Sequence, residues 1–151
     1  MINAKIALIA GEPSGDMLGA KIIKKIKAYA PNTDFYGIGG DNMINEGFKS
    51  ILPIEDFSYM GFTDVLRQYK KLQRYQKQII ETFIKTKPAM FIGVDYSSFN
   101  LGVSKALKSK NIKTIQYICP KVWAWNPNRI AKIKNSVDKV LCLFPFEEDN
   151  Q

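Results

Sequence analysis

Short apolar runs alternate with segments of helical periodicity along the chain, and this alternation restricts the possible folds more than any other feature. The apolar runs predict strands at Ile6–Ala10, Asp34–Ile38, Ala89–Val94, Thr114–Ile118 and Val137–Leu143. The periodic segments predict helices at Met17–Tyr29, Asp41–Glu46, Asp64–Lys85, Leu101–Lys108 and Arg129–Lys134. Alternating strands and helices are typical of a parallel sheet with helices on both faces. We therefore expect an α/β fold with three layers.

The bulk properties favour an anionic partner. The chain has 151 residues, the size of one ordinary domain, and a net charge of +8. Such a charge favours phosphorylated ligands, nucleic acid or an acidic membrane surface. No apolar run approaches the ~20 residues that a membrane span requires. No secretory signal precedes the first predicted strand, which favours the cytoplasm.

The chain contains no histidine, and this excludes several kinds of catalytic site within it. Ser-His and Cys-His pairs and His-ligated zinc all require an imidazole. Any general base must therefore be Asp, Glu, Lys, Tyr or Cys. Cys119 and Cys142 lack a C-x-x-C spacing, so we expect free thiols. No spacing typical of metal ligands is visible, and we predict neither a metal nor a cofactor.

Polar residues gather in four loops that follow predicted strands. The loops read "GEPSGD", "GIGGDNM", "GVDYSSFN" and "CPKVWAWNPNR". Ligands of parallel sheets bind beyond the carboxyl ends of the strands, so these loops form the candidate site. Its polar members are Glu12, Ser14, Asp16, Asp41, Asp95, Ser97, Ser98, Asn100, Asn126 and Arg129.

The first of these loops runs from a strand through glycine into a helix, which is the usual architecture of an anion site. Yet it carries Glu12 and Asp16 and no basic residue. A structural role is available to each, because Ser14 or Asp16 can cap the helix and a carboxylate near a helix N-terminus gains ~0.3–1 kcal/mol. The loop lacks the G-x-G-x-x-G pattern, so a dinucleotide site is not indicated.

Asp95 is the candidate general base. It follows an apolar strand directly, in a position that we expect to be partly buried. Partial burial favours the neutral form of a carboxyl group and so makes the carboxylate a better base. The alternative is that Asp95 only caps the following helix.

The segment "VWAW" and the residue beyond it leave two interpretations open. Trp123 and Trp125 either fill the core or form a platform for a sugar or lipid. Arg129 either caps a helix or binds phosphate.

The predicted helix from Asp64 combines basic and apolar side chains. Such a helix either has a solvated charged face or rests on an anionic membrane surface. The residues expected to contact membrane or acyl chains are Phe62, Val65, Leu66, Arg67, Tyr69, Lys70, Lys71, Leu72 and Arg74.

The motifs together resemble the lipid-A-disaccharide synthases. In order they are "AGEPSGDMLGA", "GIGG", "MGFTDVL", "VDYSSFN", "VWAW" with its flanking residues, and "FPFE". The resemblance covers nearly all of the chain. It implies a glycosyltransferase of the two-domain GT-B architecture, whose N-terminal domain is a Rossmann-like three-layer parallel sheet. Residues 1–151 then form the N-terminal, acceptor-side domain, and the C-terminal nucleotide-sugar domain is absent from this chain.

The resemblance also implies a reaction. Members transfer 2,3-diacylglucosamine from UDP-2,3-diacylglucosamine to 2,3-diacylglucosamine 1-phosphate with inversion, forming a β-1,6 linkage and releasing UDP. The product is the precursor of the lipid A anchor of lipopolysaccharide in Gram-negative bacteria. Members are cytoplasmic and peripheral to the inner membrane, so an anionic membrane surface is a further partner. Without the donor domain, we expect the chain alone to be inactive.

Site roles follow from the resemblance residue by residue. Asp95 becomes the base, and Glu12, held by backbone N–H groups of the loop, positions the acceptor together with Asn100. The remaining substrate-binding candidates are Ser14, Gly15, Asp16, Gly39, Gly40, Trp123, Trp125 and Arg129. UDP is held mainly by the absent domain.

Three positions depart from the family pattern. Ser97 replaces a proline, Ser98 replaces a second acid and Cys119 replaces a serine. Asp95 itself is kept. The alternative function is a non-catalytic half-enzyme that binds lipid or sugar phosphate. A nucleic-acid binder is disfavoured because no recognition motif is present.

Overall fold

The computed structural model describes residues 3–58, 65–95, 97–117 and 127–141. Within these residues the elements are β1 (Lys5–Ala10), α1 (Pro13–Tyr29), β2 (Asp34–Ile38), α2 (Asp41–Asn45), β3 (Phe48–Leu52), α3 (Glu55–Ser58), α4 (Val65–Thr86), β4 (Met90–Val94), α5 (Ser97–Lys108), β5 (Lys113–Tyr117), α6 (Pro127–Ser136) and β6 (Lys139–Leu141).

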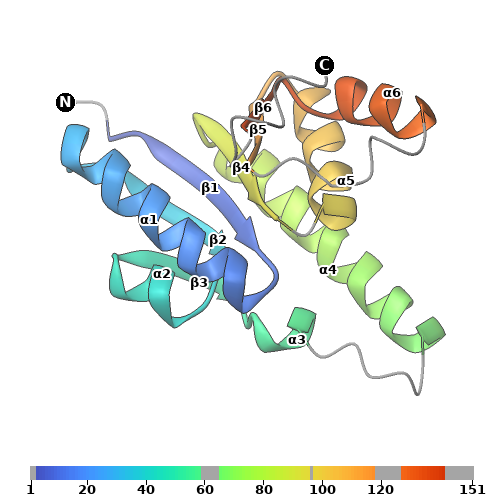
Figure 1. The fold of residues 1–151 in the computed structure, drawn as a ribbon, viewed down its shortest axis with the longest axis horizontal. Coiled ribbons are helices and arrows are strands. Elements are labelled where there is room, and N and C mark those ends of the chain that lie inside the picture. The colour runs from blue at the N-terminus through green and yellow to red at the C-terminus, as the bar shows by residue number, and fades with distance from the viewer. Residues whose placement is uncertain (1–2, 59–64, 96, 118–126, 142–151) are drawn as a thin grey trace.

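The strands form one parallel sheet in the order β3-β2-β1-β4-β5-β6. Figure 1 shows α1 and α2 on one side of the strands and α4 and α5 on the other. The predicted three-layer α/β fold is confirmed. The chain first adds strands on one side of β1 and then on the other, so the topological switch point lies between β1 and β4.

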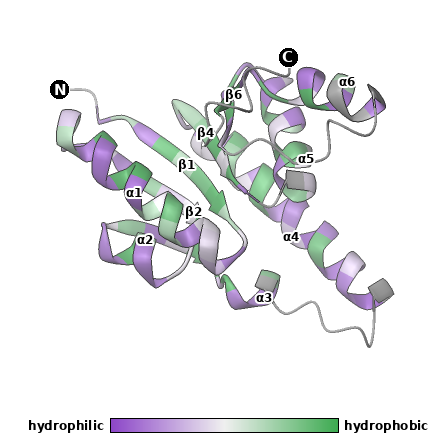
Figure 2. Ribbon diagram, viewed as in Figure 1, coloured by the Kyte–Doolittle hydropathy of each residue, from purple (hydrophilic) through white to green (hydrophobic). Residues whose placement is uncertain are grey.

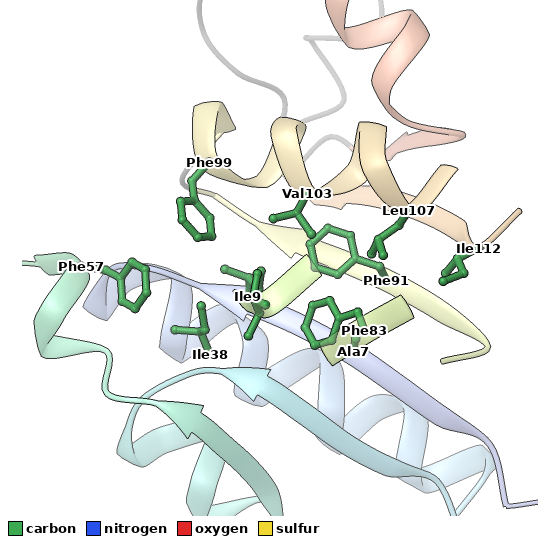
Figure 3. Packing of buried hydrophobic residues seen from close by; sticks show 11 residues of the cluster. Ala7, Ile9, Ile38, Phe57, Phe83, Phe91, Phe99, Val103, Leu107 and Ile112 are labelled. Atoms are coloured by element: carbon green, nitrogen blue, oxygen red, sulfur yellow. The ribbon is translucent and has the colours of Figure 1, made fainter. Parts of the chain in front are cut away.

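The core consists of two apolar layers, one on each face of the sheet. Ala7 and Ile9 of β1 face α4 and α5, and Figure 3 shows Phe99, Val103 and Leu107 of α5 pointing toward this layer. The alternate residues Ile6, Leu8 and Ala10 belong to the layer under α1 and α2. Side chains alternate between the two faces of a strand, so both sides of β1 are apolar, as its colour in Figure 2 shows.

Two helices start four residues earlier than predicted. Helix α1 begins at Pro13, four residues earlier than expected, because proline is favoured in the first turn of a helix. Ser14 and Asp16 therefore lie inside α1, and the prediction that one of them caps it is wrong. Glu12 is the N-cap residue. Likewise α5 begins at Ser97 rather than Leu101.

Strand β3 and helix α3 were not predicted at all. Strand β3 lies at the edge of the sheet and pairs with β2 alone. Only Phe48 of its five residues is buried, so it lacks the apolar run of a central strand. Helix α3 is a single turn of four residues, too short for a helical period.

Candidate functional site

The carboxyl ends of β1 and β4 lie side by side at the switch point of the sheet. The two strands pair in parallel with Ala10 opposite Val94. Glu12 follows Ala10 after one glycine, and Asp95 follows Val94 directly. Crevices at such switch points are where open parallel sheets bind their ligands. The sheet thus brings together the loops of the two predicted catalytic carboxylates.

Glu12 is exposed at the start of α1. Its backbone is extended, with φ −136° and ψ 157°, and its side chain makes no capping hydrogen bond. The expectation that backbone N–H groups of the loop hold this carboxylate is therefore wrong. An exposed carboxylate beside a helix N-terminus remains available to the hydroxyl groups of a ligand.

Asp16 caps the next helix instead of its own. Its Oδ1 accepts hydrogen bonds from the backbone N–H groups of Gly40 at 2.8 Å and Met43 at 3.1 Å. Its Oδ2 accepts from Asn42, through the backbone N at 3.0 Å and the side-chain Nδ2 at 2.9 Å. Asp16 is buried, so these bonds satisfy the N-terminus of α2 and join the first two loops.

The Gly39–Gly40 pair is shaped by this packing. A Cβ on Gly40 would lie 2.8 Å from Asp16 Oδ2, and one on Gly39 would lie 2.6 Å from Met43 Sδ. Gly15 is also buried, where a Cβ would lie 3.4 Å from the Val94 carbonyl. These glycines let α1, α2 and the sheet approach one another. Ser14 is exposed in the first turn of α1.

Asp95 is half-buried and adopts a left-handed backbone conformation with φ +51°. Its backbone N–H donates to the Tyr117 carbonyl at 3.2 Å. Its carbonyl accepts from Asn100 Nδ2 at 2.7 Å and from Gln116 Nε2 at 3.2 Å. Within the described residues, no hydrogen bond or ion pair engages the Asp95 carboxylate.

Residues 6–150 match the family model of lipid-A-disaccharide synthetase. The chain belongs to this family. The chain is 46% identical over 146 residues to lipid-A-disaccharide synthase 2 of Legionella pneumophila (strain Lens), covering 97% of the chain and 38% of the relative. It is 46% identical over 143 residues to the lipid-A-disaccharide synthase of Glaesserella parasuis serovar 5 (strain SH0165), covering 95% and 37%.

A third relative has a similar identity and coverage. The chain is 45% identical over 146 residues to the lipid-A-disaccharide synthase of Haemophilus influenzae (strain PittGG), covering 97% of the chain and 37% of the relative. The predicted family resemblance is therefore confirmed. The chain spans less than two fifths of the length of these curated relatives.

In this member of the lipid-A-disaccharide synthetase family, Asn100 lies behind the Asp95 turn rather than open to solvent. It is fully buried, and its Nδ2 donates to the carbonyls of Asp95 and, at 3.4 Å, Ile9. Sequence reasoning missed Gln116, which lies in β5 and is also fully buried. The one signal was a polar residue inside the apolar run "TIQYI".

For several other predicted site residues, the side chain is not among the parts that the structure describes. Phe62, Trp123 and Trp125 fall outside the described residues. Arg129 lies in α6, and Val65 and Leu66 lie in α4, but their side chains are not described. Both interpretations of the tryptophans and of Arg129 remain predictions.

Helix α4 of this family member divides its residues between core and solvent. Ile79 and Phe83 are buried and Leu72 packs against their cluster. Tyr69 is 59% exposed, and its expected contact with membrane or acyl chains stays a prediction. Four long polar side chains line a surface hollow of 430 Å³: Lys70, Gln73, Arg74 and Lys77.

Lys71 differs from the other basic residues of α4. Its Nζ lies 3.3 Å from Asp56 Oδ1 and 5.5 Å from the centre of the Tyr75 ring. The Tyr75 hydroxyl donates to Asp56 Oδ2 at 2.7 Å, and this hydrogen bond holds the pKa of Asp56 below its usual range. Lys71 and Tyr75 thus fasten α3 to α4.

Two features are absent from the described part of this family member. Among those residues, no group of three or more His, Cys, Asp or Glu side chains is arranged to hold a metal ion. None of the helices in the described ranges has the length and apolar character to span a bilayer.

Proposed function

We propose that this chain is the acceptor-side part of a lipid-A-disaccharide synthase. The reaction transfers 2,3-diacylglucosamine from UDP-2,3-diacylglucosamine to 2,3-diacylglucosamine 1-phosphate and releases UDP. Family membership supports the reaction class, and the names of the relatives supply the product. The observation that carries the site is the pairing of β1 with β4, because it brings the loops of Glu12 and Asp95 together at the switch point.

In the proposed mechanism Asp95 is the general base of a single displacement. The acceptor hydroxyl oxygen attacks the anomeric carbon of the donor sugar while its proton passes to the Asp95 carboxylate. The bond from that carbon to the UDP oxygen breaks at the same time, and UDP leaves with the electron pair. Attack from the opposite face inverts the anomeric centre and gives the β-1,6 linkage. The carboxylate is half-buried and has no hydrogen-bond partner among the residues that the structure describes, which suits this role.

Glu12 is proposed to orient the acceptor. Its exposed carboxylate is an acceptor of hydrogen bonds, and a sugar presents several hydroxyl donors. The expected role of the loop as an anion site is thus replaced by a role in binding hydroxyl groups. Ser14 lies two residues further on, exposed in the same turn, and is proposed to assist.

The donor site is proposed to lie outside this chain. The chain covers less than two fifths of its relatives, which leaves ample sequence for a nucleotide-sugar domain. A displacement needs both substrates held in one oriented complex, and this orientation is worth up to ~7–11 kcal/mol. The chain alone is therefore expected to bind acceptor without catalysing transfer.

The chain is proposed to act at the cytoplasmic surface of the inner membrane. Both substrates carry acyl chains, so the site must approach a bilayer. The exposed basic residues Lys70, Arg74 and Lys77 of α4 suit the anionic headgroups of such a surface.

The test separates binding from turnover in the isolated chain. We expect a short-acyl analogue of 2,3-diacylglucosamine 1-phosphate to bind in isothermal titration calorimetry, and UDP not to bind. Incubation with both substrates should release no UDP. The matched control is Glu12→Gln, which keeps the size of the side chain and should weaken binding of the analogue. Tight UDP binding or clear turnover by the isolated chain would contradict the proposal. If the chain binds the acceptor analogue but a longer protein that contains it also fails to catalyse transfer, a non-catalytic half-enzyme is favoured.

A further inference from the structure

Two buried amide side chains converge on one backbone carbonyl, that of Asp95. Asn100 Nδ2 donates to it at 2.7 Å from α5, and Gln116 Nε2 donates to it at 3.2 Å from β5. Both amides are 0% exposed. One turn is therefore held from two separate elements, α5, which follows it directly along the backbone, and β5, which is distant from it in sequence.

The turn that they hold is an unfavourable one. Asp95 has φ +51°, a left-handed conformation that is costly for residues other than glycine, although aspartate tolerates it better than most. Hydrogen bonds to its carbonyl favour this conformation over the extended alternatives. Because the direction of the Asp95 side chain depends on this backbone conformation, the two amides also fix where the carboxylate points.

The arrangement is not explained by stability alone. Asn100 Oδ1 and Gln116 Oε1 are buried and find no hydrogen-bond partner in the described structure. A buried unpaired acceptor is destabilising, so an apolar residue of similar size at position 116 would pack in the strand without that penalty. Each amide donates a hydrogen bond to the Asp95 carbonyl, so the arrangement points to a role beyond packing.

The neighbouring strand β4 leaves room for the two amides. Gly93 of β4 pairs with Gln116 in the sheet register. A Cβ on Gly93 would lie 2.6 Å from Gln116 Oε1 and 2.9 Å from Asn100 Cβ. The glycine therefore leaves the space through which both amides reach the carbonyl two residues further along.

We propose that Gln116, together with Asn100, is a positioning residue for Asp95. Gln116 acts on the reaction through the Asp95 turn and does not itself touch substrate. This inference rests on the proposed function of Asp95 as the general base. The tests therefore distinguish an error in the role proposed for Gln116 from an error in the role proposed for Asp95.

The first test uses the chain as it is, by NMR. Gln116→Met keeps the length of the side chain and removes the donor. We expect the Cα and Cβ shifts and the backbone coupling of Asp95 to move toward conformationally averaged values. The matched control is Ser104→Ala, which alters another buried polar side chain, one that makes no bond to Asp95. It should leave the Asp95 signals in place.

Unchanged Asp95 signals in Gln116→Met would overturn the proposal. Gln116→Val, which suits a strand, serves as a second variant if Gln116→Met does not fold. If both variants lose their dispersed spectra, Gln116 is required for folding rather than for positioning, and the proposal is also overturned.

The second test is a double-mutant cycle in an active enzyme. Residues 1–151 replace the matching N-terminal part of the Legionella pneumophila (strain Lens) relative, giving a chimeric synthase. We expect Gln116→Met to lower kcat about tenfold or more, since small displacements of a reacting group are costly, and to change KM less than twofold. In the Asp95→Asn background the same substitution should cost no further activity.

The outcomes distinguish the two hypotheses. Equal losses from Gln116→Met in both backgrounds would show a general structural effect and overturn the positioning role. Near-normal activity of Asp95→Asn alone would instead contradict the proposed function of Asp95 as the base.

Discussion

The Asp16 carboxylate, in the first turn of α1, accepts a hydrogen bond from the Gly40 backbone N–H at 2.8 Å. One helix thus supplies the cap of the next. The bond also joins the loop after β1 to the loop after β2, so the "GEPSGD" and "GIGG" motifs form one structural unit.

Replacing Asp16 is expected to destabilise the fold strongly. Asp16→Ala removes four hydrogen bonds to a buried carboxylate and leaves the N–H groups of Gly40 and Met43 unpaired. Hydrogen bonds to charged groups contribute ~1.5–3 kcal/mol each, and their effects overlap, so we expect a loss of about 2–4 kcal/mol. Urea unfolding measures it. Asp41→Ala, an exposed aspartate in the first turn of α2, is the control and should cost under about 1 kcal/mol. Equal losses in the two variants would contradict the capping role.

Replacing Asp95 is expected to stop turnover and to spare binding. In the chimeric synthase, Asp95→Asn keeps the shape of the side chain but cannot accept the proton. Base catalysis commonly contributes ~10²–10⁴-fold, so kcat should fall by about that factor. Binding of the acceptor analogue should change little. A variant that kept more than a tenth of the rate would make Glu12 the next candidate for the base.

The basic face of α4 is expected to bind anionic lipid. The chain should co-sediment with vesicles of anionic lipid at low salt and much less with neutral vesicles, because each basic residue near such a surface is worth ~1 kcal/mol and salt screens the attraction. Changing Lys70, Arg74 and Lys77 together to Gln should remove most of this binding. Lys71 is spared because it pairs with Asp56.

The matched control for that experiment lies on α1. Changing Lys21, Lys24 and Lys25 to Gln removes the same charge from three other exposed lysines. If both triple variants lose binding equally, net charge alone attracts the chain. If neither loses binding, the charges of α4 form a solvated face.

The stability of the chain is expected to depend on Asp138 at acidic pH. Hydrogen bonds from Thr114, first from its backbone N–H at 2.8 Å, hold the pKa of Asp138 below its usual range. A lowered folded-state pKa gives stability that is present above the unfolded value, about 3.9, and is lost as the pH falls through the folded value. The free energy of unfolding should therefore fall less steeply with acid in Asp138→Asn than in the wild type. Parallel curves from about pH 5 to pH 2 would contradict this.

The sequence allowed the central strands of the sheet to be predicted but not the edge strand β3. Ile6–Ala10 and Ala89–Val94 are apolar on both faces, and such runs are recognisable because parallel strands are buried on both sides. Strand β3 is neither apolar nor buried on both faces, since Ile51 is 37% exposed and Lys49 is exposed as well. Its assignment as a strand depends on pairing with β2, which is information that the local sequence does not carry.

The candidate site was predictable in part for a similar reason. Asp95 follows a strand directly and Glu12 follows one after a single glycine, so their place at the carboxyl edge could be inferred from the order of elements. The role of Gln116 could not, because it depends on lying opposite Gly93 in the register of two strands. The target of Asp16 was missed because the start of α1 was placed four residues late and the partner lies on another helix.

The position of β1 in the middle of the sheet governs the order in which the chain can fold during synthesis. Strands β1, β2 and β3 and helices α1 and α2 are contiguous in sequence and can associate as soon as they emerge. The other edge of β1 pairs with β4, so Ile6 must wait for Met90. Until then β1 presents a row of unpaired backbone groups on an apolar strand, which is a template for association between chains. A nascent or truncated chain that ends before Met90 is therefore expected to aggregate, and α4 is the last segment that the ribosome delivers before this edge is closed.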